Sequence, residues 1–148
     1  PEDLRDVVAR TVVEEARAQG LDPAVVLAVI KVESRFKVEA RSRKGARGLM
    51  QMMPRVARDM MGGTLTEAQL VDPETNVRLG IVHLGALIQE HGDLYAGLAA
   101  YNMGSRKVRA HLRDKPGLHA RDFRYTRQVL HEAALLKATH PRGVFAAN

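Results

Sequence analysis

Apolar side chains recur along most of this chain at the three- and four-residue spacing of amphipathic helices. The pattern predicts helices over about residues 2–18, 73–90, 94–101, 105–113 and 121–139, and shorter helical turns over 54–61 and 66–70. No stretch alternates with period two for long enough to predict a strand, although a small hairpin within residues 41–50 stays open. The expected fold class is therefore all-α or mainly α.

The same spacing indicates which side chains face the core. Inward positions are predicted at Val56, Met60, Met61, Tyr125, Val129, Leu130, Leu135 and Leu136. Gly80 and Gly85 interrupt an otherwise regular helical pattern at a cost in stability, which indicates close approach of a neighbouring helix. Helix starts are marked by Asp22, Thr66, Asp72, Asp93 and Ser105, whose side chains suit the N-cap.

The stretch from Asp22 to Pro54 organises the rest of the chain. Asp22 and Pro23 fit the N-cap and first position of a helix that ends near Ser34 or Phe36. From residue 25 to residue 32 the only polar side chain is a lysine, so this helix should be buried in the core.

Glu33 follows that apolar run and lies on the face of Val26, Val29 and Ile30. Burial and the negative end of the helix dipole both disfavour the ionised carboxylate. A carboxylic acid that keeps its proton near neutral pH is what a general acid requires. Taken alone, Glu33 is better explained as a glutamate at a helix end that is exposed to water or paired with Lys37, four residues on.

Two further motifs follow Glu33 and Ser34 along the chain. The first comprises Ala40, Ser42, Gly45 and Ala46, followed by Gly48-Leu49-Met50-Gln51 and Pro54, and the second is Ala100-Tyr101-Asn102 with Gly104. Methionines in the first could merely fill gaps in the core, and Tyr101 with Asn102 could merely end a helix. The three motifs together resemble the signature of the soluble lytic transglycosylase family, over about residues 22–129.

This resemblance implies a lysozyme-like fold and a peptidoglycan-cleaving enzyme with Glu33 as its catalytic acid. It also implies a saccharide groove with the substrate-binding residues Ser34, Met50, Gln51, Met53, Tyr101, Asn102 and Tyr125. Gln51 would supply directional hydrogen bonds to a sugar, and Tyr101 would lie beside the acid. One departure is visible: Arg121, Asp122 and Phe123 stand where the family commonly has Glu-Thr-Arg before the tyrosine that Tyr125 matches.

The mechanism that the resemblance implies uses one carboxyl group. Glu33 would protonate the oxygen between N-acetylmuramic acid and N-acetylglucosamine, the substrate's N-acetyl group would stabilise C1, and Glu33 would then take a proton from the C6 hydroxyl to close a 1,6-anhydro ring. Two alternatives stay open: a goose-type-like lysozyme that hydrolyses the same bond, and a wall-binding module of a secretion or phage assembly without cleavage.

The length and composition of the chain bear on its number of domains, on membrane insertion and on its partners. A length of 148 residues fits one domain over 1–148, expected to be a monomer, and no apolar run approaches the roughly 20 residues of a membrane span. The net charge of +6 suits polyanionic surroundings such as the bacterial cell wall, whereas 4% aromatic residues offer few stacking platforms for nucleic acid. The basic cluster at Arg121, Arg124 and Arg127 is interpreted as a solvated helix face.

Residue counts and spacing also decide whether a metal or a cofactor is expected, and the expected substrate indicates the location. There is no cysteine, and the six histidines lack zinc-ligand spacing, so neither a metal nor a cofactor is expected. The expected partners are peptidoglycan glycan strands, within an envelope, secretion or phage assembly. The expected location is the periplasm or cell envelope.

Overall fold

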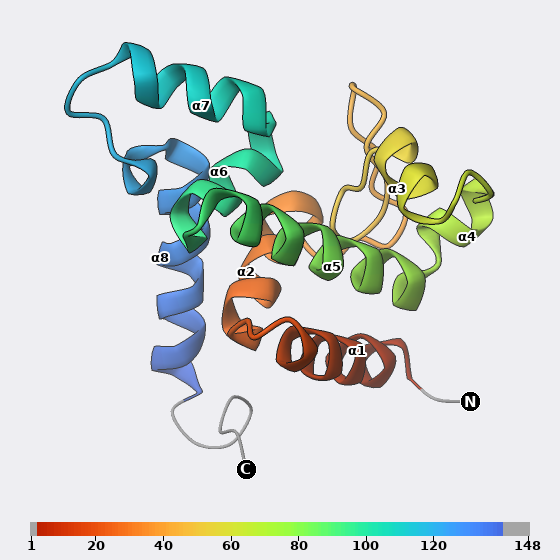
Figure 1. Cartoon of the computed structure of the whole chain (residues 1–148). Coiled ribbons are helices and arrows are strands. Elements are labelled where there is room, and N and C mark those ends of the chain that lie inside the picture. The colour runs from red at the N-terminus through yellow and green to blue at the C-terminus, as the bar shows by residue number, and fades with distance from the viewer. Residues whose placement is uncertain (1–2, 141–148) are drawn as a thin grey trace.

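A computed structural model describes residues 3–140, and these are almost entirely helical (Figure 1). The elements in order are α1 (Leu4–Ala18), α2 (Pro23–Ser34), α3 (Pro54–Met60), α4 (Glu67–Val71), α5 (Pro73–His91), α6 (Leu94–Met103), α7 (Ser105–Asp114), the 3-10 turn η1 (Ala120–Asp122) and α8 (Arg124–Thr139). The predicted all-α class is confirmed. Residue 2, where the first helix was expected to begin, lies outside the described residues.

The hairpin region contains only isolated pairing. Arg47 forms antiparallel bridges with Arg41 and with Met52, and no longer strand occurs within residues 3–140. The connection between α2 and α3 is therefore a folded loop, whose ends are held by backbone hydrogen bonds instead of a sheet.

Helix starts follow the predicted caps at four places. The carboxylates of Asp22, Asp72 and Asp93 accept from backbone amides in the first turns of α2, α5 and α6, at 2.9, 2.9 and 2.7 Å. Thr66 and Gln69 form a reciprocal capping box at α4. Because these side chains satisfy otherwise free amides, local sequence fixes where each helix begins.

Helix α2 lies at the centre of the packing, between α1 and α8 and behind α5 in the view of Figure 1. Its Val26, Val29 and Ile30 have no exposed surface and pack into the main core cluster. The same cluster includes Val77, Ile81 and Leu84 from α5 and Val129 from α8. Burial of most of α2, with Lys31 as its exposed residue, agrees with the near absence of polar residues in this helix.

Helices α5 and α6 approach closely because α6 has a glycine at the contact. A Cβ atom built at Gly97 would lie 2.7 Å from the Cα of Ile88, so only glycine fits there. Gly80 presses against the Met50 side chain and Gly85 against that of Gln19. At Gly85 the neighbour is the C-cap residue of α1, so the predicted close approach of a helix holds there. At Gly80 the neighbour is a loop residue, and the prediction of a helix is wrong.

Two inward predictions are wrong. Met61 is 47% exposed because it follows the last residue of α3 and precedes a glycine turn, and Ala57 takes the fully buried position. Leu135 is 45% exposed, whereas Ala133 is buried. At 100° per residue, Leu135 lies about 200° around α8 from Ala133, on the solvent side.

Three helix boundaries also differ from prediction. Helix α6 continues to Met103, so Asn102 belongs to the helix and not to the turn. Ser105 is the first residue of α7 and not its cap, because Gly104 occupies the N-cap position and the Ser105 hydroxyl lies 2.9 Å from His91 Nε2. Helix α8 begins at Arg124 because Phe123 has extended backbone angles.

None of the helices described in residues 3–140 has the length and apolar character needed to cross a membrane.

Candidate active site

Glu33 lies in the last turn of α2, where the buried helix reaches the surface. Its side chain is half-buried, and the two residues after Ser34 turn the chain away. Arg35 and Phe36 both have left-handed backbone angles, with φ of 51° and 62°. This conformation is uncommon for residues other than glycine, and such outliers gather at functional sites.

Helix α8 supplies the partner of the Glu33 carboxyl. The Tyr125 hydroxyl donates a hydrogen bond of 2.7 Å to Glu33 Oε1, and Tyr125 itself is buried. An ion pair between Lys31 and Glu132, with 2.6 Å between Nζ and Oε2, joins the same two helices. Glu33 makes no ion pair with Lys37 among the described residues, so the alternative of an exposed paired glutamate is not what the fold adopts.

Burial dominates the electrostatics of Glu33. Removal from water raises the pKa of its carboxyl, and the hydrogen bond from Tyr125 lowers that pKa by a smaller amount. Burial also raises the pKa of Tyr101 and of Tyr125 well above the ordinary range, and the nearby Glu33 charge adds to both shifts. The site therefore combines a carboxyl that tends to keep its proton with two phenols that stay protonated.

The loop before α3 is fixed by Asn76, a fully buried residue of α5. Its Nδ2 donates to the backbone oxygens of Arg47 and Leu70 at 3.0 and 2.9 Å, and its Oδ1 accepts from Met50 N at 2.8 Å. Gly48 has φ of 79°, and a Cβ there would lie 2.3 Å from Asn76 Nδ2. Glycine is therefore required at this position both by conformation and by space.

Gln51 turns back onto its own loop. Its backbone is left-handed, with φ of 51°, and its Nε2 donates to the backbone oxygens of Ala40 and Gly48 at 3.0 and 2.9 Å. No donor to its side-chain oxygen occurs in the part of the chain that the structure describes. The amide group thus braces the loop while its oxygen stays available as an acceptor.

A cleft of about 510 Å3 lies beside this loop. It brings together four of the predicted substrate-binding residues, namely Gln51, Met53, Tyr101 and Asn102. The cleft does not include Glu33. Tyr101 connects the cleft with Glu33, because it lines the cleft and the Glu33 charge raises its pKa. Its hydroxyl donates a 2.7 Å hydrogen bond to the Met50 backbone oxygen.

Ser34 and Met50 are placed differently from those four residues. The Ser34 hydroxyl is buried and donates to the Ile30 backbone oxygen at 3.0 Å. The Met50 side chain is fully buried in the main core. Both residues adjoin the site through the backbone, and their side chains face the interior.

Sequence reasoning missed His83, another residue that lines the cleft. Its ring centroid lies 5.5 Å from that of Tyr101, and burial lowers its pKa, although Glu90 acts in the opposite direction. The imidazole makes no hydrogen bond to any residue between 3 and 140. The histidines show no metal-ligand spacing and His83 belongs to none of the three motifs, so nothing in the sequence marks this residue.

The residues that depart from the family motif have local roles. Asp122 accepts from the His119 backbone amide at 3.0 Å and caps η1, while Phe123 is buried in a second core cluster near the ring of His111. Arg121 is exposed. Within the described residues, no group of three or more His, Cys, Asp or Glu side chains could hold a metal ion.

The three motifs and the site around Glu33 agree with a match of the sequence to a known protein family. The sequence matches the Transglycosylase SLT domain family over residues 10–123, and the chain belongs to that family. This assignment confirms the resemblance drawn from the three motifs.

Named relatives agree with the family match. The chain is 34% identical over 107 residues to the Membrane-bound lytic murein transglycosylase C of Actinobacillus pleuropneumoniae, a match that covers 63% of this chain and 29% of that protein. It is 35% identical over 98 residues to the Soluble lytic murein transglycosylase of Escherichia coli strain K12, covering 62% and 15%.

Solved structures give the same result. An inactive glutamate-to-glutamine mutant of the lytic transglycosylase Slt from Pseudomonas aeruginosa matches with a TM-score of 0.75 and 32% identity, over 93% of this chain and 25% of that chain. The 70-kDa soluble lytic transglycosylase in complex with bulgecin A matches with a TM-score of 0.77 and 26% identity, over 97% and 25%. The lysozyme-like all-α fold is confirmed, and the chain spans only about a quarter of those relatives.

Proposed function

We propose that this chain is the catalytic domain of a peptidoglycan lytic transglycosylase, with Glu33 as its single general acid and base. The observation that carries the proposal is the hydrogen bond from Tyr125 to Glu33 at the end of a buried helix. A half-buried carboxyl with a raised pKa and one fixed oxygen has the protonation and orientation that acid catalysis requires.

In the proposed reaction, protonated Glu33 gives its proton to the oxygen between N-acetylmuramic acid and N-acetylglucosamine. The bond from that oxygen to C1 breaks, and the substrate's N-acetyl group stabilises C1. The Glu33 carboxylate then takes the proton of the C6 hydroxyl, whose oxygen bonds to C1 and closes the 1,6-anhydro ring. No water enters the product.

The surroundings of Glu33 support this mechanism. Glycosidases that act on water use two carboxyl groups about 5–9.5 Å apart. Among the described residues, burial and the Tyr125 hydroxyl are what shift the pKa of Glu33, and no neighbouring carboxylate contributes to that shift. A transglycosylase is therefore favoured over the lysozyme alternative.

For the saccharide we propose contacts with Gln51, Met53, Tyr101 and Asn102, which share the cleft. The Gln51 oxygen suits a sugar hydroxyl or acetamide donor. Ser34 and Met50 complete the motif-based assignment, and their buried side chains favour a supporting part in which they hold Glu33 and Gln51 in place. Tyr125 would orient the catalytic carboxyl.

The larger context is also proposed by similarity. The relatives are named membrane-bound or soluble murein transglycosylases, and this chain matches 29% or less of their length. We propose action on the cell wall, in the periplasm or cell envelope. Recruitment by a secretion, envelope or phage assembly and a monomeric state stay predictions.

Mass spectrometry of the sugars released from purified peptidoglycan tests the proposal. Products one water lighter than reducing muropeptides are expected from the native chain and not from Glu33→Gln. Glu39→Gln is the matched control, because Glu39 is an exposed carboxylate in the following loop. Reducing ends would instead indicate a lysozyme, and absence of product from a folded native chain would favour the wall-binding module.

A further inference from the structure

His83 is a polar side chain of the cleft that has no hydrogen-bond partner in the fold. Its imidazole is half-buried and contacts the Tyr101 ring at a tilt, but neither ring nitrogen is hydrogen-bonded to any residue between 3 and 140. In that part of the chain no enclosed side-chain nitrogen or oxygen lacks a partner, so the ring nitrogens of His83 are open to solvent. Because polar groups that leave water are normally paired, a ligand in the cleft is a suitable partner for this ring.

The position of His83 is fixed by the same face of α5 that holds the neighbouring loop. Asn76, seven residues earlier, accepts from the Met50 amide, and Gly80 packs against the Met50 side chain. At about 100° per residue, these three positions of α5 lie within about 60° of one another around the helix. The imidazole therefore stands on a helix face that is itself bonded to the loop of the cleft.

The cleft combines this ring with an apolar wall. Leu87, one helical turn after His83, lines the cleft together with Ala100 and Met103 of α6. Burial lowers the pKa of His83, so the ring is neutral at pH 7 and has one N–H donor and one acceptor. A ligand group that suits these surroundings carries a hydrogen-bond acceptor beside a small apolar part.

We propose that His83 recognises the acetamide group of an N-acetylated sugar, donating to its carbonyl oxygen while its methyl group packs on the apolar wall. This proposal rests on the proposed function, because it takes an N-acetylated glycan strand as the ligand. A sugar hydroxyl has no methyl group, so it satisfies only the imidazole and leaves the wall uncovered. Asn102 is exposed, and a hydrogen bond from it contributes less than one from the half-buried ring.

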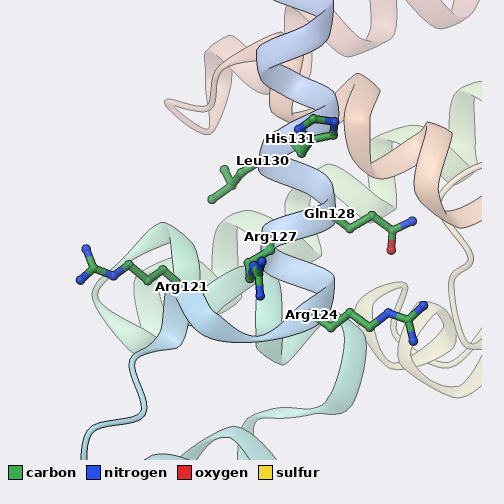
Figure 2. Close-up of a pocket in the computed structure, with 6 residues that line it drawn as sticks. All are labelled: Arg121, Arg124, Arg127, Gln128, Leu130 and His131. Carbon is green, nitrogen blue, oxygen red and sulfur yellow. The ribbon is translucent and has the colours of Figure 1, made fainter.

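A separate hollow supplies the matched control. Figure 2 shows this hollow along α8, and its lining residues are all different from those of the cleft. Its arginines, Arg121, Arg124 and Arg127, are exposed, which confirms the predicted solvated helix face. Its His131 is also exposed, so His131→Gln changes a histidine that a sugar bound in the cleft does not contact.

Binding of chitopentaose, a pentamer of N-acetylglucosamine, to the Glu33→Gln protein tests the proposal without turnover. His83→Phe keeps an aromatic ring against Tyr101 but removes the donor, so the affinity should fall about fivefold. His83→Gln restores a side-chain N–H and should recover part of this loss. His131→Gln should bind as tightly as the Glu33→Gln protein itself, and circular dichroism checks that each variant is folded.

NMR spectroscopy locates the contact. With chitopentaose that carries ¹³C in its acetyl groups, nuclear Overhauser effects are expected from the acetyl methyl protons to the ring protons of His83 and to the side chain of Leu87. The ring nitrogen signals of His83 should shift on binding, because one nitrogen gains a hydrogen bond. Those of His131 should stay in place.

Unchanged affinity in His83→Phe would overturn the proposal, as would a failure of the Glu33→Gln protein to bind chitopentaose. Equal losses in His83→Phe and His83→Gln with unmoved ring nitrogen signals would also overturn it, because they indicate a merely structural role. Contacts of His83 with sugar ring protons alone would assign it to a hydroxyl. Failure of the proposed function has a different signature: the native chain would release no anhydro product while His83-dependent binding of chitopentaose persists.

Discussion

The Tyr125 hydroxyl and the Glu33 carboxyl are 92 positions apart in the sequence and 2.7 Å apart in the fold. The bond crosses from α8 to α2 and fixes one oxygen of the acid at the end of the buried helix. Because the phenol donates to the carboxylate, it partly offsets the effect of burial on the Glu33 pKa. The pair therefore sets both the direction and the acidity of the proposed catalytic group.

Tyr125→Phe is expected to move the alkaline limb of the pH profile upward. Cleavage requires protonated Glu33, so kcat/KM falls as pH rises through its pKa. The Tyr125 bond stabilises the ionised form, and its removal raises that pKa further. The limb should therefore shift to higher pH, and kcat should fall because one carboxyl oxygen is no longer held.

Tyr95→Phe is the control for this shift, because the Tyr95 side chain is 43% exposed and Tyr95 joins α8 only through its backbone oxygen. Its pH profile should match that of the native chain. A limb that stays in place or moves to lower pH in Tyr125→Phe would contradict the assignment of Glu33 as the titrating acid.

His83 should titrate below the ordinary range of histidine. Burial against Tyr101 disfavours the imidazolium and lowers the pKa, and the opposing influence of Glu90 is smaller. The ring is then neutral at pH 7 and offers one donor and one acceptor to the cleft. NMR titration of the six histidines, assigned with His83→Gln, would show this, and a midpoint at or above 6.5 for His83 would refute it.

Asn76→Ala should destabilise the fold by about 2–4 kcal/mol, because it leaves several buried backbone groups unpaired at once. Activity should fall more steeply than stability alone accounts for, since the same bonds hold Met50 and Gly48. Chemical denaturation gives the free energy of unfolding. Gln89→Ala on the exposed face of the same helix should change it by less than about 0.5 kcal/mol, and a similar loss in both variants would disprove the special role of Asn76.

Local chemistry explains which parts of the fold were predictable. Asp22, Asp72 and Asp93 cap helices because each needs only its own next few residues, and the apolar run before Glu33 specifies burial by itself. Predictions of burial failed where they depended on which face of a helix points to the core, or on a residue distant in the sequence. Leu135 was assigned to the core although the inward stripe of α8 passes through Ala133.

The candidate site shows the same division. Glu33 and Tyr101 stood out because motifs mark them, but no sequence spacing connects Asn76 to the loop that it holds, 26 and 29 residues away. Gln51 is predicted to hydrogen-bond a sugar, but its side-chain Nε2 donates to backbone oxygens of its own loop, and its side-chain oxygen alone stays available. Side-chain partners across such distances are decided by tertiary packing, which a single sequence does not display.

Gly80 and Gly85 lie on the same helix and should respond oppositely to alanine. A Cβ at Gly80 would lie 2.5 Å from Met50 Sδ and 2.7 Å from Met50 Cβ, inside the fully packed core, so Gly80→Ala should cost about 1–3 kcal/mol and displace the Gln51 loop. At Gly85 the nearest atom is the Oε1 end of the exposed Gln19 side chain, at 2.4 Å, which can move aside. Gly85→Ala should therefore gain up to about 1 kcal/mol from helix propensity. Thermal unfolding and cleavage assays on both variants decide the matter: equal losses of stability would mean that packing against Met50 is not what requires glycine at position 80.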